Sequence, residues 1–413
     1  MIAPPTARQA IATVVQEEWG RILAALVKSL GDFQLAEDCL QDAVAKALAV
    51  WPENGLPDVP AAWLITTARR RALDIVRRDA RFAKRVPELS HLADMANTAP
   101  DHEVADMIPD KRLEMIFTCC HPALDEKTRV ALTLRTLGGL STNTIAAAFL
   151  DQPDAMAQRL VRAKHKIASA GIPYVIPDKT ALPDRIAGVL SVIYLIFNAG
   201  YTAANAGKSG LSDEAIRLGR IIHQLLPEDC ETAGLLALML LHDARRAARL
   251  DAQGRMVPLS DQNRHRWDRA KIAEGDALLK SVLPKGNVGP YQLQAAISAV
   301  HTTAPSWNAT DWPQIVALYD LLYQVTPTPV VQINRAMAVS QINGPQAGLA
   351  LLDDLAGTIQ LERYQSYHSA RADLLERAGH LSAACHSYDA AIALTEQEVE
   401  RAFLTAKRAR ISH

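Results

Sequence analysis

Cationic side chains are concentrated between residues 69 and 85, and their type and spacing are suited to binding an anionic partner such as nucleic acid. Eight arginines and lysines stand there against two aspartates, although the whole 413-residue chain has a formal net charge of −1. Trp63, Leu64 and Ala68 recur at helical spacing, so one face of a helix can pack while the guanidinium groups meet phosphates. A solvated basic surface is the alternative interpretation.

An acidic amphipathic segment lies just upstream, over residues 31–48. No lysine or arginine occurs between residues 29 and 45, and Asp38 and Asp42 are four residues apart. That spacing puts both carboxylates on one face of a helix. The segment therefore predicts a protein partner with a basic surface.

A second DNA-binding pattern covers residues 124–167 and implies three helices. Gly138-Gly139 ends the first helix, and Ser141 can cap the second. Residues 151–154 form a turn before the third helix. The apolar positions of the third helix, which should face a core, are Met156, Leu160, Ala163 and Ile167. Many helical hairpins imitate a helix-turn-helix, but the polar positions of this third helix are free to reach DNA.

In this order the segments resemble sigma factors of the extracytoplasmic-function type, within the sigma-70 family. The acidic helix, the turn at residues 51–60 and the basic helix resemble the second conserved region. Residues 158–164 resemble the end of the fourth region. Residues 108–124 and 194–201 resemble a subgroup with a long helical C-terminal extension that carries tetratricopeptide-like repeats.

The resemblance implies roles for particular residues. Those expected to bind the clamp helices of core RNA polymerase are Glu37, Asp38 and Asp42. Those expected at the opened −10 promoter element are Trp63, Arg69, Arg70, Arg77 and Arg78. Those expected at the −35 element are Gln158, Arg159, Arg162 and Lys164. Thr144 and Ala199 depart from the family, which usually has glutamate at both positions.

Composition and pattern predict an all-α chain. Aromatic residues make up only 5% of it, and alanine and leucine are abundant. The expected parts are a sigma region 2 at 10–86, an acidic linker at 87–109, a region 4 helix-turn-helix at 110–170, a helical extension at 182–289, and tetratricopeptide-like repeats at 290–413.

The repeats are seen in three tripeptides that recur about every 33 to 36 residues. They are Leu318-Tyr319-Asp320, Leu351-Leu352-Asp353 and Ser387-Tyr388-Asp389. Gly344 and Gly379 fall at the expected hairpin turns. Such an array builds a concave surface for a protein or peptide partner. An ordinary helical domain with duplicated hairpins is the alternative.

Enzymatic, metal and membrane functions find no support in the sequence. Cys119-Cys120-His121 has no second Cys/His pair at zinc spacing, so we expect at least one of these cysteines in a core. No catalytic motif or cofactor-binding loop is visible. Five cysteines suggest reduced thiols in the cytoplasm. No secretory signal is evident, and the most apolar run, residues 186–197, is too short to span a bilayer.

The prediction is an alternative sigma factor that binds core RNA polymerase, directs promoter-specific initiation and is regulated in cis by its helical extension. The alternative is a helix-turn-helix regulator with a partner-sensing repeat domain that never joins the polymerase. The acidic helix at 31–48 discriminates, because such a regulator has no use for it. A pure scaffold leaves the arginine cluster unexplained.

Overall fold

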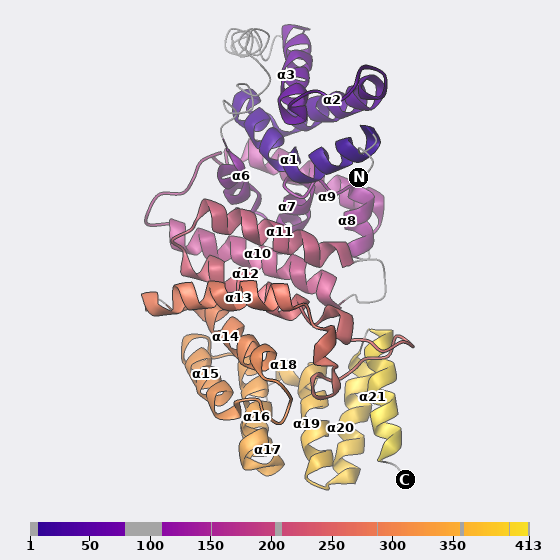
Figure 1. The fold of residues 1–413 in the computed structure, drawn as a ribbon, viewed down its shortest axis with the longest axis vertical. Coiled ribbons are helices and arrows are strands. Elements are labelled where there is room, and N and C mark those ends of the chain that lie inside the picture. Colours follow the sequence, from indigo (N-terminus) through magenta and orange to yellow (C-terminus); the bar gives the residue numbers. More distant parts are fainter. Residues whose placement is uncertain are drawn as a thin grey trace. The chain divides into compact units, whose positions relative to one another are not determined.

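A computed structural model describes residues 7–78, 110–149, 151–202, 209–286, 288–355, 359–395 and 397–411 (Figure 1). Within these ranges the regular elements are α-helices and short 3-10 helices, together with one isolated bridge between Leu250 and Met256. The predicted all-α fold is confirmed. The expected linker at 87–109 lies outside the described residues.

The chain divides into two compact units, Met1–Leu218 and Gly219–His413, which are described separately. The helices of the first unit are α1 (Ala7–Leu30), α2 (Phe33–Asn54), α3 (Pro60–Arg78), α6 (Arg112–Cys119), α7 (Glu126–Thr136), α8 (Thr142–Ala148), α9 (Pro153–Ser169), α10 (Leu182–Thr202) and the start of α11 (Ser209–Leu225). We call α1–α3 the first bundle and α6–α9 the second bundle.

Side-chain caps set the helix starts in both bundles. Asp32 accepts a hydrogen bond from the Leu35 amide at the start of α2, and Asp125 does the same for Thr128 in α7. The predicted cap on α8 is also present, because the Thr144 amide donates to Ser141 Oγ over 3.1 Å. Each cap satisfies an amide that has no partner within its helix.

The extension begins inside the first unit. The sequence predicts a new domain from residue 182, but α10 packs against α6 and α7, and the boundary between the units falls within α11. Arg185 of α10 donates to the Phe117 carbonyl over 2.5 Å. The second bundle and the start of the extension therefore form one packed body.

Helix α10 is also longer than its apolar run suggests. The helix extends beyond the apolar run 186–197, and residues Leu182–Tyr201 are long and apolar enough to cross a membrane by length and composition only. A core helix of a soluble protein passes the same test. The buried side chains of α10 are Ile186, Val189, Leu190, Val192, Ile193, Ile196 and Phe197. This burial accounts for its apolar composition.

The second unit is an array of paired helices. Beyond α11 it contains α12 (Cys230–Asp243), α13 (Arg269–Val282), α14 (Pro290–Thr303), α15 (Trp312–Val325), α16 (Pro329–Asn343), α17 (Pro345–Asp353), α18 (Ile359–Glu362), α19 (Gln365–Arg377), α20 (Leu381–Leu394) and α21 (Glu398–Arg410). Its short 3-10 helices are η2 (Arg246–Ala248), η3 (Leu259–Asp261), η4 (Arg264–Arg266) and η5 (Leu283–Lys285).

An ion pair recurs through this array. The aspartate that ends each of the three recurring tripeptides pairs with an arginine on a helix that follows it in the chain. The pairs are Asp320 with Arg335, Asp353 with Arg371, and Asp389 with Arg408, at 2.5, 3.3 and 3.0 Å. Gly344 and Gly379 turn the hairpins with φ of 83° and 81°. The hairpins thus repeat in sequence and in contact, while their membership of the tetratricopeptide class stays a prediction.

Gly200, in the 194–201 motif, allows α10 and α11 to approach closely. A Cβ atom there would lie 2.4 Å from the Ser212 backbone nitrogen, so the backbone would have to shift. We predict that Gly200→Ala lowers the free energy of unfolding by about 1–3 kcal/mol. Hydrogen exchange of the α10 and α11 amides in urea measures it. Gly210→Ala, with nothing within 4 Å, is the matched control and should be neutral or stabilising.

Candidate polymerase and promoter interface

The acidic helix α2 divides its carboxylates between solvent and interior. Asp38 and Asp42 are exposed, as the sequence predicts. Gln34 donates to Asp38 over 2.8 Å, and Arg71 of α3 pairs with Asp42 at 2.7 Å. Both aspartates remain accessible to a basic protein surface. The Arg71 contact was missed, since no local pattern links residues 29 positions apart.

Glu37 is buried, with 3% of its surface exposed. The sequence interpretation places it toward the polymerase, but here it faces the second bundle. Arg135 of α7 donates to Glu37 Oε1 from Nε over 2.6 Å. Lys164 of α9 pairs with the other carboxylate oxygen. In this arrangement Glu37 is therefore not available to an outside protein.

The charge state of Glu37 follows from these contacts. Burial on its own raises the pKa of the carboxyl group, but the attraction of Lys164 and Arg135 and their hydrogen bonds hold it below its usual range. Glu37 is therefore ionised in the folded protein. It forms a three-residue ion cluster, which we call the Glu37 cluster, with Arg135 and Lys164.

The two bundles also meet through apolar and backbone contacts. Tyr174, after α9, donates from its hydroxyl to the Ala24 carbonyl over 3.0 Å. Gly139, at a φ of 65°, leaves room for the Trp19 ring, which a Cβ atom would approach to 3.2 Å. A Cβ atom at Gly20 would likewise lie 3.0 Å from the Leu137 carbonyl oxygen. The Glu37 cluster is thus one part of a packed contact.

The predicted DNA-contacting residues of helix α3 differ in their exposure to solvent. Arg70 is exposed, and Trp63 is half-buried with its ring 5.4 Å from that of Trp51. Arg69 is 9% exposed, because it shares a helical face with Ile65 and Ala72, and burial lowers its pKa. Its expected role at DNA is not available in this arrangement. Arg77 and Arg78 close α3, but their side chains lie outside the described residues.

Helix α9 has the core face that its sequence predicts. The four predicted core residues are its buried ones: Met156, Leu160, Ala163 and Ile167. Gln158 and Arg162 are exposed, whereas Arg159 pairs with Asp151 at 2.6 Å. Lys164 is held by Glu37. Two of the four predicted −35 contacts therefore face solvent without an ion pair among the described residues.

The adjacent cysteines belong to the second bundle's core. Cys119 and Cys120 are buried, with Sγ atoms 3.2 Å and 3.6 Å from the hydroxyls of Thr136 and Thr133. Burial raises the pKa of Cys120 to about 11. Neutral thiols at these positions are poor metal ligands. Among the described residues, no group of three His, Cys, Asp or Glu side chains is placed to hold a metal ion.

Two segments of the chain match known protein families. Residues 14–82 match the sigma-70 region 2 family, and residues 185–283 match a family of unknown function (DUF6596). The chain is 42% identical over 388 residues to the uncharacterized protein R00370 of Rhizobium meliloti (strain 1021), covering 92% of this chain and 91% of that protein. No solved structure matches.

Residues 14–82 are therefore a sigma-70 region 2, which supports a sigma factor of the sigma-70 family, and the chain as a whole belongs to the same group as R00370. Members of the sigma-70 family are non-enzymatic transcription factors. The second region of the family binds core RNA polymerase and promoter DNA. The match includes α2, α3 and α1 from residue 14 onward, so these helices are that region.

The exposed acids of α2 can be tested by charge reversal. We predict that Asp38→Lys with Asp42→Lys weakens binding to core RNA polymerase roughly 100-fold or more, because like charges then oppose each other across the contact. Co-sedimentation or a pull-down with purified core enzyme measures it.

The control for this test is Glu126→Lys with Asp184→Lys, which makes the same change in net charge at exposed positions on α7 and α10. The control should bind normally. Unchanged affinity in the α2 variant would remove α2 from the polymerase contact.

Proposed function

We propose that this protein is an alternative sigma factor of the extracytoplasmic-function type, which directs promoter-specific initiation and is regulated in cis by its helical extension. The observation that carries the proposal is the sigma-70 region 2 match over residues 14–82, on an acidic α2 followed by a basic α3. These are the faces that a polymerase and an opened promoter require.

The second bundle supports −35 recognition. Helix α8 is a seven-residue helix that is followed, after a short turn, by the 17-residue α9. This is the order of a helix-turn-helix, in which the second helix enters the major groove and its N-terminal half contacts base edges. Gln158 and Arg162 are exposed on α9 and carry donors suited to bases and phosphates.

A helix-turn-helix regulator that never joins the polymerase is the second candidate. Such a regulator accounts for α8 and α9 but gives the exposed acidic surface at Asp38 and Asp42 of α2 no outside protein to bind. Run-off transcription with purified core polymerase and this chain separates the two candidates. Only a sigma factor produces promoter-specific transcripts from core enzyme alone.

Substitution of Arg162→Ala should weaken binding to a −35 duplex by about 1–3 kcal/mol if the guanidinium reads a base, and by less if it touches only phosphate. A gel shift at fixed salt measures the change. Lys179→Ala, which removes an exposed cation outside the helix-turn-helix, is the control and should leave binding unaltered. If both variants bind as the parent does, α9 is not the reading helix.

Regulation in cis is supported by how the first unit is packed. The −35 and −10 elements are about 25 base pairs apart, or roughly 85 Å along B-DNA. Lys164 on α9 and Glu37 on α2 are in direct contact. The two bundles therefore have to separate before they engage both elements of one promoter.

The extension packs on the second bundle beside the face that meets the first bundle. Arg217 of α11 donates to the Leu137 carbonyl over 2.8 Å, next to the residues that contact α1. Arg185 of α10 bonds to Phe117. The start of the extension thus supports the face of the second bundle that packs on the first, which gives it a means to control opening.

We predict that Glu37→Gln favours separation of the bundles, because breaking a buried ion pair removes about 3–5 kcal/mol from a contact. Energy transfer between dyes at Ala45 and Val161, both exposed, should fall. Binding of −35 duplex should strengthen as Lys164 is released.

Glu114→Gln is the matched control, since Glu114 is a buried carboxylate whose partner Lys111 lies in the same bundle. It should leave the energy transfer unchanged. Equal energy transfer in Glu37→Gln and the parent would show that the cluster does not hold the bundles together.

A further inference from the structure

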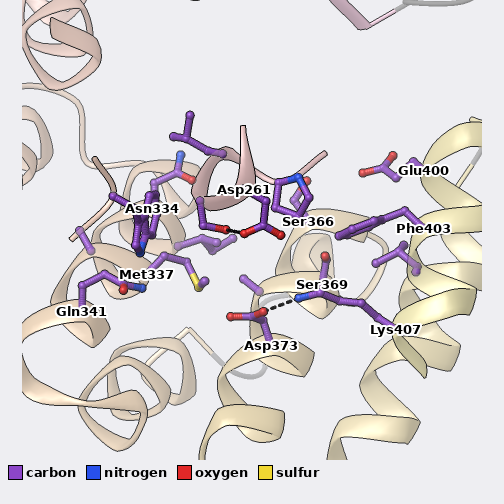
Figure 2. Close-up of a pocket in the computed structure, with 18 of the residues that line it drawn as sticks. Asp261, Asn334, Met337, Gln341, Ser366, Ser369, Asp373, Glu400, Phe403 and Lys407 are labelled. Atoms are coloured by element: carbon purple, nitrogen blue, oxygen red, sulfur yellow. Dashed lines mark hydrogen bonds and ion pairs between the residues drawn. The ribbon is translucent and has the colours of Figure 1, made fainter. Parts of the chain in front are cut away.

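A groove of about 610 Å³ runs through the second unit. Figure 2 shows Asn334, Met337 and Gln341 of α16 on one side and Ser366, Ser369 and Asp373 of α19 facing them, with α21 beyond. Asp261, at the end of η3, projects between the two sides. Three helices from successive hairpins therefore share one groove, of a volume that suits a bound ligand.

The cations of this groove are already engaged. Lys407 pairs with Asp373 at 2.7 Å, as Figure 2 shows, and Arg410 pairs with Glu376 at 2.5 Å. Each positive charge is thus matched by a carboxylate of the protein itself. An acidic ligand would have to displace one of these pairs.

Two carboxylates in the groove have no such partner. Asp261 accepts a hydrogen bond from the neighbouring Ser260 hydroxyl over 2.8 Å, and Glu400 accepts one from the Gln365 side chain, while burial raises the pKa of Glu400. Neither Asp261 nor Glu400 has an ion pair within the described residues. They come from separate elements, the η3 loop and α21. The groove therefore presents carboxylates without a cationic partner at two places.

Aromatic rings line the end of the groove near α14 and α15. Trp307 and Trp312 lie 4.7 Å apart, and His301 stacks on Trp307. Burial lowers the pKa of His301 to about 4, so this ring adds no positive charge at neutral pH. Indole faces attract ammonium and guanidinium groups.

We propose that this groove binds an extended, positively charged peptide segment of a partner protein, with lysine or arginine side chains at Asp261 and Glu400. The amide side chains of Asn334 and Gln341 line the same groove and can pair with peptide N–H and C=O groups. The separation of the two carboxylates onto different elements favours a ligand with several cations along a chain. The proposal goes beyond the sigma activity and does not depend on it.

The test is fluorescence anisotropy with the full-length protein and no polymerase or DNA. The probe is a labelled nonapeptide of alternating lysine and leucine, and its counterpart has glutamate in place of lysine. We expect the lysine peptide to bind, with affinity that falls as salt rises, and the glutamate peptide not to bind. Asp261→Asn and Glu400→Gln should each weaken binding about tenfold, by loss of one charge-assisted contact.

Glu398→Gln is the matched control, because Glu398 is exposed on α21 two residues from Glu400 and does not line the groove. It should bind as the parent does. Equal binding of both peptides, or unchanged affinity in the Asp261 and Glu400 variants, would overturn the proposal. Displacement of the peptide by spermidine at equal concentration would also overturn it, in favour of a small polyamine.

Discussion

The buried carboxylate of Glu37 is the constraint on which the arrangement of the first unit depends. An ionised group with 3% exposure needs charged partners, and both of its partners come from the other bundle. The contact therefore selects one relative placement of α2, α7 and α9. The packing of Trp19 on Gly139 and of Tyr174 on α1 agrees with that placement.

Helical periodicity was enough to predict the core face of α9 and the cap at Ser141, because both depend on neighbours within one or two turns. The same reasoning failed at Glu37 and Arg69. Arg135 and Lys164 are 98 and 127 residues from Glu37, so no local pattern reveals them. Arg69 was read as part of a basic surface, although its position relative to Ile65 and Ala72 puts it on the packed side.

The boundary between the two units was also hidden from the sequence. A linker after residue 170 suggests a new domain, whereas α10 packs on the second bundle through its apolar face. Composition reports that a helix is buried but not which neighbour covers it. The match to a family of unknown function begins at residue 185, inside the first unit. The part of this chain that matches that family therefore includes helices packed within the first unit.

The recurring aspartate–arginine pair of the second unit gives successive hairpins the same kind of contact with their neighbours. The α16–α17 hairpin, for example, pairs Arg335 with Asp320 of the preceding α15 and Asp353 with Arg371 of the following α19. Contacts of this kind involve nearest neighbours alone, so stability adds up hairpin by hairpin. A chain built in this way can lengthen or shorten by whole hairpins during evolution and so change the reach of its groove without redesigning the rest of the protein.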